Sequence, residues 1–171
     1  MAPSKCAVLF DLDETLVLTS KIEPLRKLRD WPKVYVSFSQ TELPPGTLNF
    51  IARVKALADV QIGVVTKSPR TYAERLLKYH GIPIPVLIAY HDVQRHKPHP
   101  NALIKAAERL KLPPARCVYV GDHPDDIAAA GAANCMSIAV CWAGNSDLRD
   151  VCDSWDAVYE RVMLIFGRLN G

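Results

Sequence analysis

Residues 6–16 read Cys-Ala-Val-Leu-Phe-Asp-Leu-Asp-Glu-Thr-Leu, an apolar run that ends in two carboxylates, Asp11 and Asp13. A run that is apolar at successive positions is typical of a strand buried on both faces of a parallel sheet. Aspartate is rare in strands and an unpaired buried charge is costly, so two aspartates at the strand's end need a reason. We expect the reason to be a divalent cation, with one carboxylate left to act as a nucleophile.

Two later stretches repeat this pattern of an apolar strand that ends in polar groups. Residues 60–65 run into Thr66, and residues 117–120 run into Gly121 and Asp122. A helical pattern follows each stretch, so strands and helices alternate along the chain. This order predicts an α/β fold, an open parallel sheet with helices on both faces. Ligands bind outside the carboxyl ends of the strands in such sheets, so we expect the three polar strand ends to share one site.

The same reasoning sets the expected elements. We expect strands near residues 6–11, 60–66, 86–90, 116–121 and 135–140, and helices near 47–58, 69–80, 99–111, 124–132 and 154–168. The strand near 86–90 is expected at an edge of the sheet, because two prolines precede it and proline cannot donate to a strand ladder. The segment 17–46 departs from the alternation. Its residues 34–39 alternate with period two, which predicts a hairpin strand after a short helix.

The chain resembles the haloacid dehalogenase superfamily of phosphohydrolases, a Rossmann-like fold. Four signatures of that superfamily occur here in order and span residues 6–127. They are the run Asp11–Leu16, Thr66, Lys97, and Gly121-Asp122 followed by Asp126. The first and the fourth signatures are specific, whereas a lone threonine or lysine carries weight only beside them.

The resemblance implies a Mg²⁺-dependent phosphatase that hydrolyses a phosphate monoester through an aspartyl-phosphate on Asp11. Asp13 is then the general acid for the leaving oxygen and the general base for the attacking water. Mg²⁺ would bridge Asp11, the backbone carbonyl of Asp13, and Asp122. The Thr66 hydroxyl and Lys97 would hold the phosphate oxygens, with further donors around Leu12 and Lys67.

The resemblance also implies a role for Asp126, which orients Lys97 or a metal-bound water. Its neighbour Asp125 is expected only to favour the first turn of the helix that follows. Four histidines near these signatures suggest a zinc site, but they lie in loops and lack cysteines at ligand spacing, so we favour Mg²⁺.

The intervals between the signatures are too short for a separate cap domain of the larger kinds. We therefore expect residues 1–171 to form a single catalytic domain with a minimal lid around 17–46 and an open site. Five basic residues lie in the lid: Lys21, Arg26, Lys27, Arg29 and Lys33. They form either a solvated helix face or a basic lip that attracts phosphorylated substrates.

Composition narrows the alternatives. The net charge of +3 is too small to argue for nucleic acid by itself. A small phosphorylated substrate is the expected partner; a phosphatase that processes nucleic-acid ends and a non-catalytic binding module of the same fold remain alternatives. No apolar run reaches the roughly 20 residues of a membrane helix, and residues 1–5 show no signal-peptide pattern. Five cysteines without a CxxC pair fit a reducing compartment, so we expect a cytoplasmic protein without a membrane partner.

Overall fold

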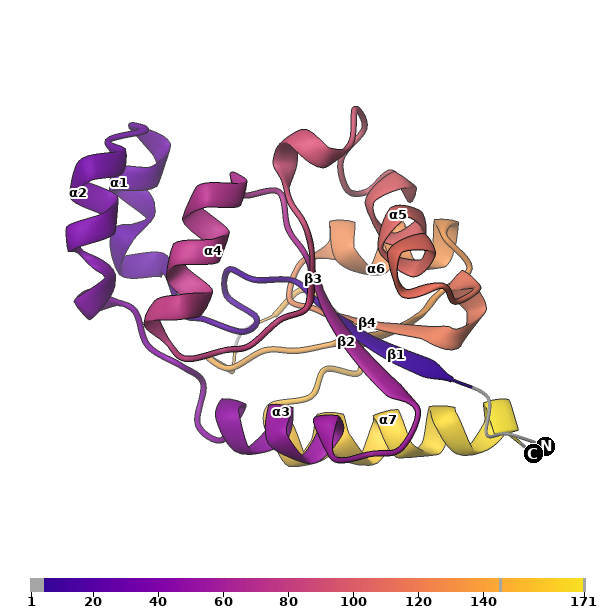
Figure 1. Cartoon of the computed structure of the whole chain (residues 1–171). Helices are drawn as coiled ribbons and strands as arrows, with labels where there is room; N and C mark the ends of the chain where they lie inside the picture. The colour runs from indigo at the N-terminus through magenta and orange to yellow at the C-terminus, as the bar shows by residue number, and fades with distance from the viewer. Residues whose placement is uncertain (1–4, 145, 171) are drawn as a thin grey trace.

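A parallel sheet of five strands forms the centre of the computed structural model, which describes residues 5–144 and 146–170 (Figure 1). The strands are β1 Cys6–Phe10, β2 Val60–Val65, β3 Val86–Ile88, β4 Cys117–Gly121 and β5 Met136–Ala139. Their order in the sheet is β3-β2-β1-β4-β5, and every neighbouring pair is parallel. The predicted α/β fold is confirmed, and β3 lies at an edge as expected.

Helices cover both faces of this sheet. They are α3 Thr47–Lys55, α4 Arg70–Tyr79, α5 Asn101–Leu110, α6 Pro124–Ala132 and α7 Trp155–Asn170. Alternate residues of β1 enter two separate cores: Val8 and Phe10 pack with α3, α4 and α7, whereas Ala7 and Leu9 pack with α5 and α6. Both faces of β1 are thus covered, which explains why its sequence is apolar at every position.

The register of the sheet gathers the polar strand ends. Phe10, the last residue of β1, pairs with Val64 of β2 on one side and with Val120 of β4 on the other. The next residue, Asp11, donates its backbone N–H to the Val120 carbonyl at 2.9 Å. The chain continues to β2 on one side of β1 and to β4 on the other, so Asp11 lies where the strand order reverses. Open α/β sheets bind their ligands at this switch point.

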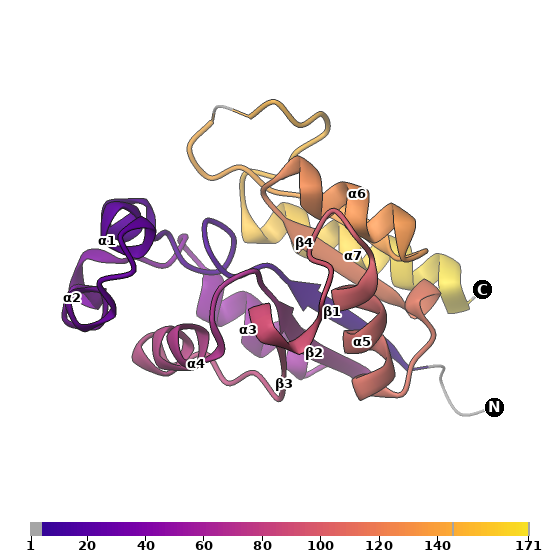
Figure 2. The same ribbon diagram turned by 90° about the horizontal axis from the view of Figure 1, so that it is seen from above.

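The lid is helical. It contains the short 3₁₀ turns Ser20–Ile22 and Phe38–Gln40 and the helices α1 Glu23–Lys27 and α2 Trp31–Val36. Both views show α1 and α2 at one end of the molecule, beyond α4 from the sheet (Figure 2). Leu18 and Glu42 exchange two backbone hydrogen bonds, which close the base of the lid.

The predicted hairpin strand at residues 34–39 is wrong, because this segment belongs to α2 and the 3₁₀ turn after it. The Asp30 carboxylate accepts the Lys33 backbone N–H, and a proline follows in the first turn of the helix. Such a start favours a helix. Trp31 stacks on Tyr35 one turn later, and Tyr35 contacts Phe38. These aromatic residues are spaced four and three positions apart, as on one face of a helix. Their packing decides the structure of the segment in spite of its period-two sequence pattern.

One expectation touches residues outside the described part of the chain. Residues 1–4, where the sequence shows no signal-peptide pattern, are among those not described. Within the described ranges, no helix is both long and apolar enough to cross a membrane.

Candidate active site

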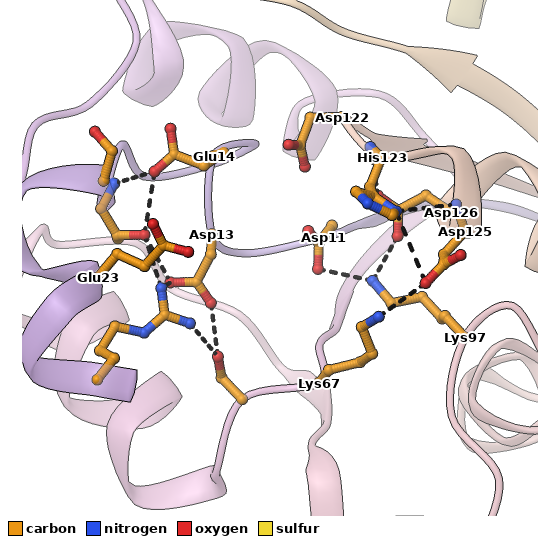
Figure 3. Close-up of a pocket in the computed structure, with 14 residues that line it drawn as sticks. Asp11, Asp13, Glu14, Glu23, Lys67, Lys97, Asp122, His123, Asp125 and Asp126 are labelled. Carbon is orange, nitrogen blue, oxygen red and sulfur yellow. Dashed lines mark hydrogen bonds and ion pairs between the residues drawn. The ribbon is translucent and has the colours of Figure 1, made fainter. Parts of the chain in front are cut away.

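A pocket of about 360 Å³ opens at the carboxyl ends of β1, β2 and β4 (Figure 3). It brings together six of the predicted site residues: Asp11, Asp13, Lys67, Lys97, Asp122 and Asp126. They come from four separate parts of the chain, and the sheet register places them around one space. Leu12 and Thr66, also predicted, are not among the residues that line it.

Lys97 lies at the buried end of the pocket, with only 2% of its side chain exposed. Its ammonium donates to Asp11 at 2.8 Å, to Asp126 at 2.6 Å and to the Tyr119 hydroxyl at 2.7 Å. Burial alone lowers the pKa of Lys97, but the charges of Asp11 and Asp126 outweigh it, and the pKa is raised. Lys97 therefore stays a cation. The sequence did not point to Tyr119, which looks like an ordinary residue of an apolar strand.

Three carboxylates converge beside this lysine. One oxygen each of Asp11, Asp122 and Asp126 lies within 4.8 Å of the other two. Burial raises the pKa of Asp11 to about 7 in spite of the opposing charge of Lys97. Burial, and then the charge of Asp126, raise the pKa of Asp122. Carboxylates whose ionisation is opposed first by burial and then by a neighbouring carboxylate fit a hard divalent cation, which would favour their charged form and accept oxygen ligands.

The side chain of Asp13 lies outside this group and faces the lid instead (Figure 3). Arg26 approaches one carboxylate oxygen at 2.8 Å, and Ser68 donates to the other at 2.6 Å. Thr19 and Tyr72 donate to the first oxygen at 2.9 and 2.7 Å. Sequence reasoning named Arg26 only as one of five basic lid residues and missed the other three. Most of these partners are distant from Asp13 in the sequence, so the residues around Asp13 give no indication of them.

The remaining predicted residues have clear structural places. The Thr66 hydroxyl accepts the backbone N–H of Ser68 at 3.0 Å, so it shapes the turn after β2. Leu12 is fully buried, and its carbonyl accepts the Leu16 N–H at 2.9 Å. Lys67, about half exposed, pairs with Asp125 at 2.9 Å. Thus Asp125 has a charge partner that the sequence did not predict.

Asp126 and Asp122 are each fixed by further hydrogen bonds. Asp126 is 1% exposed and accepts the backbone N–H of His123 at 3.0 Å, besides its contact with Lys97. The Thr15 hydroxyl donates to Asp122 at 3.0 Å. Thr15 lies in the first signature run but was given no role by sequence. These contacts aim both carboxylates into the pocket.

Three of the five basic lid residues are neutralised at the surface. Exposed ion pairs join Lys21 to Glu42, Lys27 to Glu23 and Lys33 to Asp30. Arg26 differs, because its side chain is only 21% exposed and reaches into the pocket. The basic cluster therefore does not act as one unit.

Comparisons with known proteins agree with this geometry. A model of the haloacid dehalogenase-like hydrolases matches residues 23–140, more than half of the chain. Among curated proteins, a phosphoglycolate phosphatase of Escherichia coli K12 is 30% identical over 153 residues, or 88% of this chain. One from Salmonella typhimurium is 31% identical over 151 residues, or 87% of this chain. The chain spans about 60% of the length of these curated relatives.

Solved structures share the fold. A phosphatase of the same superfamily from Thermococcus onnurineus superposes with a TM-score of 0.75 at 19% identity, covering 92% of this chain and 97% of its own. A putative phosphoglycolate phosphatase from Lactobacillus plantarum gives a TM-score of 0.74 at 19% identity, covering 92% and 99%. At such identities the likeness concerns the fold alone.

Proposed function

The chain belongs to the haloacid dehalogenase-like hydrolases, and from that premise we propose that it is a Mg²⁺-dependent phosphatase acting on a small phosphate monoester. The observation that carries the proposal is the convergence of Asp11, Asp122 and Asp126 around one pocket, with Lys97 buried among them. The names of the curated relatives add a substrate to test first, 2-phosphoglycolate.

In this proposal Asp11 attacks the phosphorus atom, and the ester oxygen leaves with a proton from Asp13. Water then attacks the aspartyl-phosphate, Asp13 takes its proton, and inorganic phosphate is released. The Lys97 ammonium stays charged beside Asp11, where it would hold phosphate oxygens. Hydrogen-bond donors near Leu12, Thr66 and Lys67 would hold the remaining phosphate oxygens. Thr66 contributes by fixing the turn that carries Lys67 and Ser68.

Asp11, Asp122 and the backbone carbonyl of Asp13 would hold Mg²⁺, with Asp126 orienting Lys97 or a metal-bound water. The ion supplies positive charge that offsets repulsion between the carboxylates and the phosphate. Within the same proposal, residues 1–171 form one catalytic domain whose lid, residues 17–46, leaves the site open. A cytoplasmic location stays a prediction.

The test is phosphate release from purified protein over a panel of phosphorylated metabolites, an aryl phosphate, and oligonucleotides with 3′- or 5′-phosphates. We expect turnover of small esters with Mg²⁺, its loss in EDTA and its return with added Mg²⁺. Asp11→Asn should lose nearly all activity while keeping the fold by circular dichroism. Substantial activity of that variant would overturn the nucleophile. Preference for oligonucleotides with a steep salt dependence would instead support nucleic-acid end processing.

A further inference from the structure

A second hollow, of about 520 Å³, adjoins the catalytic pocket on the lid side. Glu23, Arg26, Lys67 and Ser68 line both spaces, so the hollow and the pocket are continuous. Sites that hold organic ligands usually measure about 300–1,000 Å³. The two-carbon acid of 2-phosphoglycolate is too small to occupy the hollow while its phosphate lies in the pocket. A substrate that uses the hollow therefore has a larger leaving group.

Two aromatic side chains from separate parts of the chain line this lid-side hollow. Trp31 begins α2 in the lid, and Tyr90, which is 42% exposed, follows β3. Each is supported by a ring outside the hollow: Tyr35 stacks on Trp31 with 6.3 Å between ring centres, and His96 stacks on Tyr90 at 4.0 Å. Supported rings lose little freedom when a ligand stacks on them. The hollow thus offers preformed surfaces for a flat ring.

The rest of the lining is largely polar. It includes the ion pair between Glu23 and Lys27, at 3.0 Å, together with Arg29 and His91. A hydrocarbon ring would cover these polar groups without bonding to them, which costs free energy. A nucleobase has donors and acceptors along its edge and a π-face for stacking. The aromatic and polar lining together fit a nucleobase better than a hydrocarbon ring.

The hollow also lies on the side of the pocket where the leaving group departs. In the proposed mechanism Asp13 protonates the leaving oxygen. Ser68, which lines the hollow, donates to the Asp13 carboxylate at 2.6 Å. Another space, of about 330 Å³, meets the pocket at Asp122, a proposed metal ligand. The leaving group is therefore expected in the lid-side hollow.

We propose that the substrate is a nucleoside 5′-monophosphate whose base stacks on Tyr90 and Trp31 in the lid-side hollow. The phosphate then lies in the catalytic pocket, and the ribose spans the boundary between the two spaces. A 5′ ester places the whole sugar between phosphorus and base, as two separate spaces require. A ring bonded directly to the phosphate oxygen, as in an aryl phosphate, does not reach the hollow. This inference rests on the proposed phosphatase function.

The first test compares three substrates on the wild-type protein with Mg²⁺. Adenosine 5′-monophosphate and ribose 5-phosphate share the phosphorylated sugar and differ in the base, and p-nitrophenyl phosphate carries a ring without a spacer. We expect kcat/KM for adenosine 5′-monophosphate to exceed that for ribose 5-phosphate about tenfold or more. Stacking is equal in the ground state and the transition state, so the difference should lie mainly in KM.

The second test replaces one stacking ring. Tyr90→Ala should lower kcat/KM for adenosine 5′-monophosphate about tenfold and leave the values for ribose 5-phosphate and p-nitrophenyl phosphate unchanged. Tyr90→Phe keeps the ring and should keep the wild-type value. Tyr79→Ala is the matched control, because Tyr79 is also an exposed tyrosine beside a histidine ring but lines neither space. Trp31 also packs against Tyr72, so its replacement disturbs the lid and Tyr90 is the residue to vary.

Three outcomes would overturn the proposal. One is a wild-type protein that does not prefer adenosine 5′-monophosphate to ribose 5-phosphate, a comparison that needs no variant to fold. Another is an equal effect of Tyr90→Ala on the two substrates, including no effect. The third is a higher kcat/KM for a 5′-phosphorylated oligonucleotide than for the mononucleotide, because the hollow would then hold the end of a nucleic acid.

Calorimetry on Asp11→Asn separates this proposal from the proposed function, because it measures binding without turnover. We expect adenosine 5′-monophosphate to bind about tenfold more tightly than ribose 5-phosphate, and addition of Tyr90→Ala to remove the difference. If the base binds through Tyr90 while the wild type hydrolyses no phosphate ester, the hollow holds a nucleotide and the phosphatase function is wrong. If hydrolysis depends on Asp11 but the base adds no affinity, the assignment of the hollow is wrong.

Discussion

At the scale of single residues, Lys97 shows how one cation stabilises a crowded acidic site. Its ammonium is almost fully buried and donates to the carboxylates of Asp11 and Asp126 and to the phenol of Tyr119. Removing one member of a buried charged group costs far more than the group's net contribution, because the remaining charges lose their partner. Lys97 is therefore expected to matter for stability as well as for phosphate binding.

We predict that Lys97→Met lowers the free energy of unfolding by about 3–5 kcal/mol in metal-free buffer and removes phosphatase activity. The control is Lys67→Met. It breaks a half-exposed pair with Asp125 and should cost within about 1 kcal/mol. Urea unfolding of the two variants beside the wild type measures the two changes in stability, and phosphate release measures activity. A Lys97 variant as stable as the Lys67 variant would show that the buried ammonium contributes little net stability.

At the scale of elements, the junction between β4 and α6 determines where Asp126 points. A Cβ atom at Gly121, the last residue of β4, would lie 2.5 Å from the Asp126 carboxylate. Real side chains do not approach so closely, so the strand can lie against the start of the helix only with glycine there. The glycine of the fourth signature thus has a packing reason that is separate from chemistry.

Gly121→Ala should therefore push Asp126 out of place, destabilise the protein by about 1–3 kcal/mol and reduce turnover. Gly131→Ala is the control within α6, because a Cβ there meets nothing within 4 Å. Alanine is the better helix former, so that change should be neutral or stabilising by up to about 1 kcal/mol. Thermal unfolding and turnover of both variants check the pair; equal behaviour of the two would contradict this view of the junction.

The sheet could be predicted from the sequence, whereas the lid could not. The strands β1, β2 and β4 could be predicted because each is an apolar run, as a buried parallel strand requires. Each run ends just before a polar residue of the site, Asp11, Thr66 or Asp122. In the lid, the short alternating stretch at residues 34–39 was misread as a strand. Its helix is fixed by the cap at Asp30 and by aromatic contacts with α4, including Trp31 against Tyr72. Contacts between distant segments, like the one from Arg26 to Asp13, leave no trace in a local pattern.

At the scale of the whole molecule, the three carboxylates of Asp11, Asp122 and Asp126 make the stability of the fold depend on pH and on bound metal. Burial raises the pKa of Asp11 to about 7 in the folded protein, whereas an unfolded aspartate titrates near about 4. Between these values the folded state holds a proton that the unfolded state has lost. The free energy of unfolding therefore falls as pH rises through this range, and the loss persists above it. A cation bound to the ionised carboxylates offsets this loss.

We predict that the midpoint of thermal unfolding in EDTA drops between pH 5 and pH 8 more for the wild type than for Asp11→Asn, since asparagine does not ionise. Added Mg²⁺ should raise the wild-type midpoint at pH 8 and change it little at pH 5, where protons occupy the site. Calorimetry at the two pH values, with and without Mg²⁺, measures this. The same Mg²⁺ shift in Asp11→Asn at pH 8 would place the metal elsewhere.

The proposed mechanism requires that Asp11 becomes phosphorylated during turnover. The most direct measurement is an acid quench of the enzyme mixed with substrate and Mg²⁺, followed by peptide mass mapping. Asp13→Asn with p-nitrophenyl phosphate is the pair to use: this leaving group departs without a proton, so the intermediate still forms, whereas loss of the general base slows its hydrolysis and lets it accumulate. We predict a phosphorylated peptide with the modification on Asp11, absent from Asp11→Asn and from samples in EDTA. Phosphate release without any phosphorylated aspartate, or with phosphate on another residue, would contradict the account.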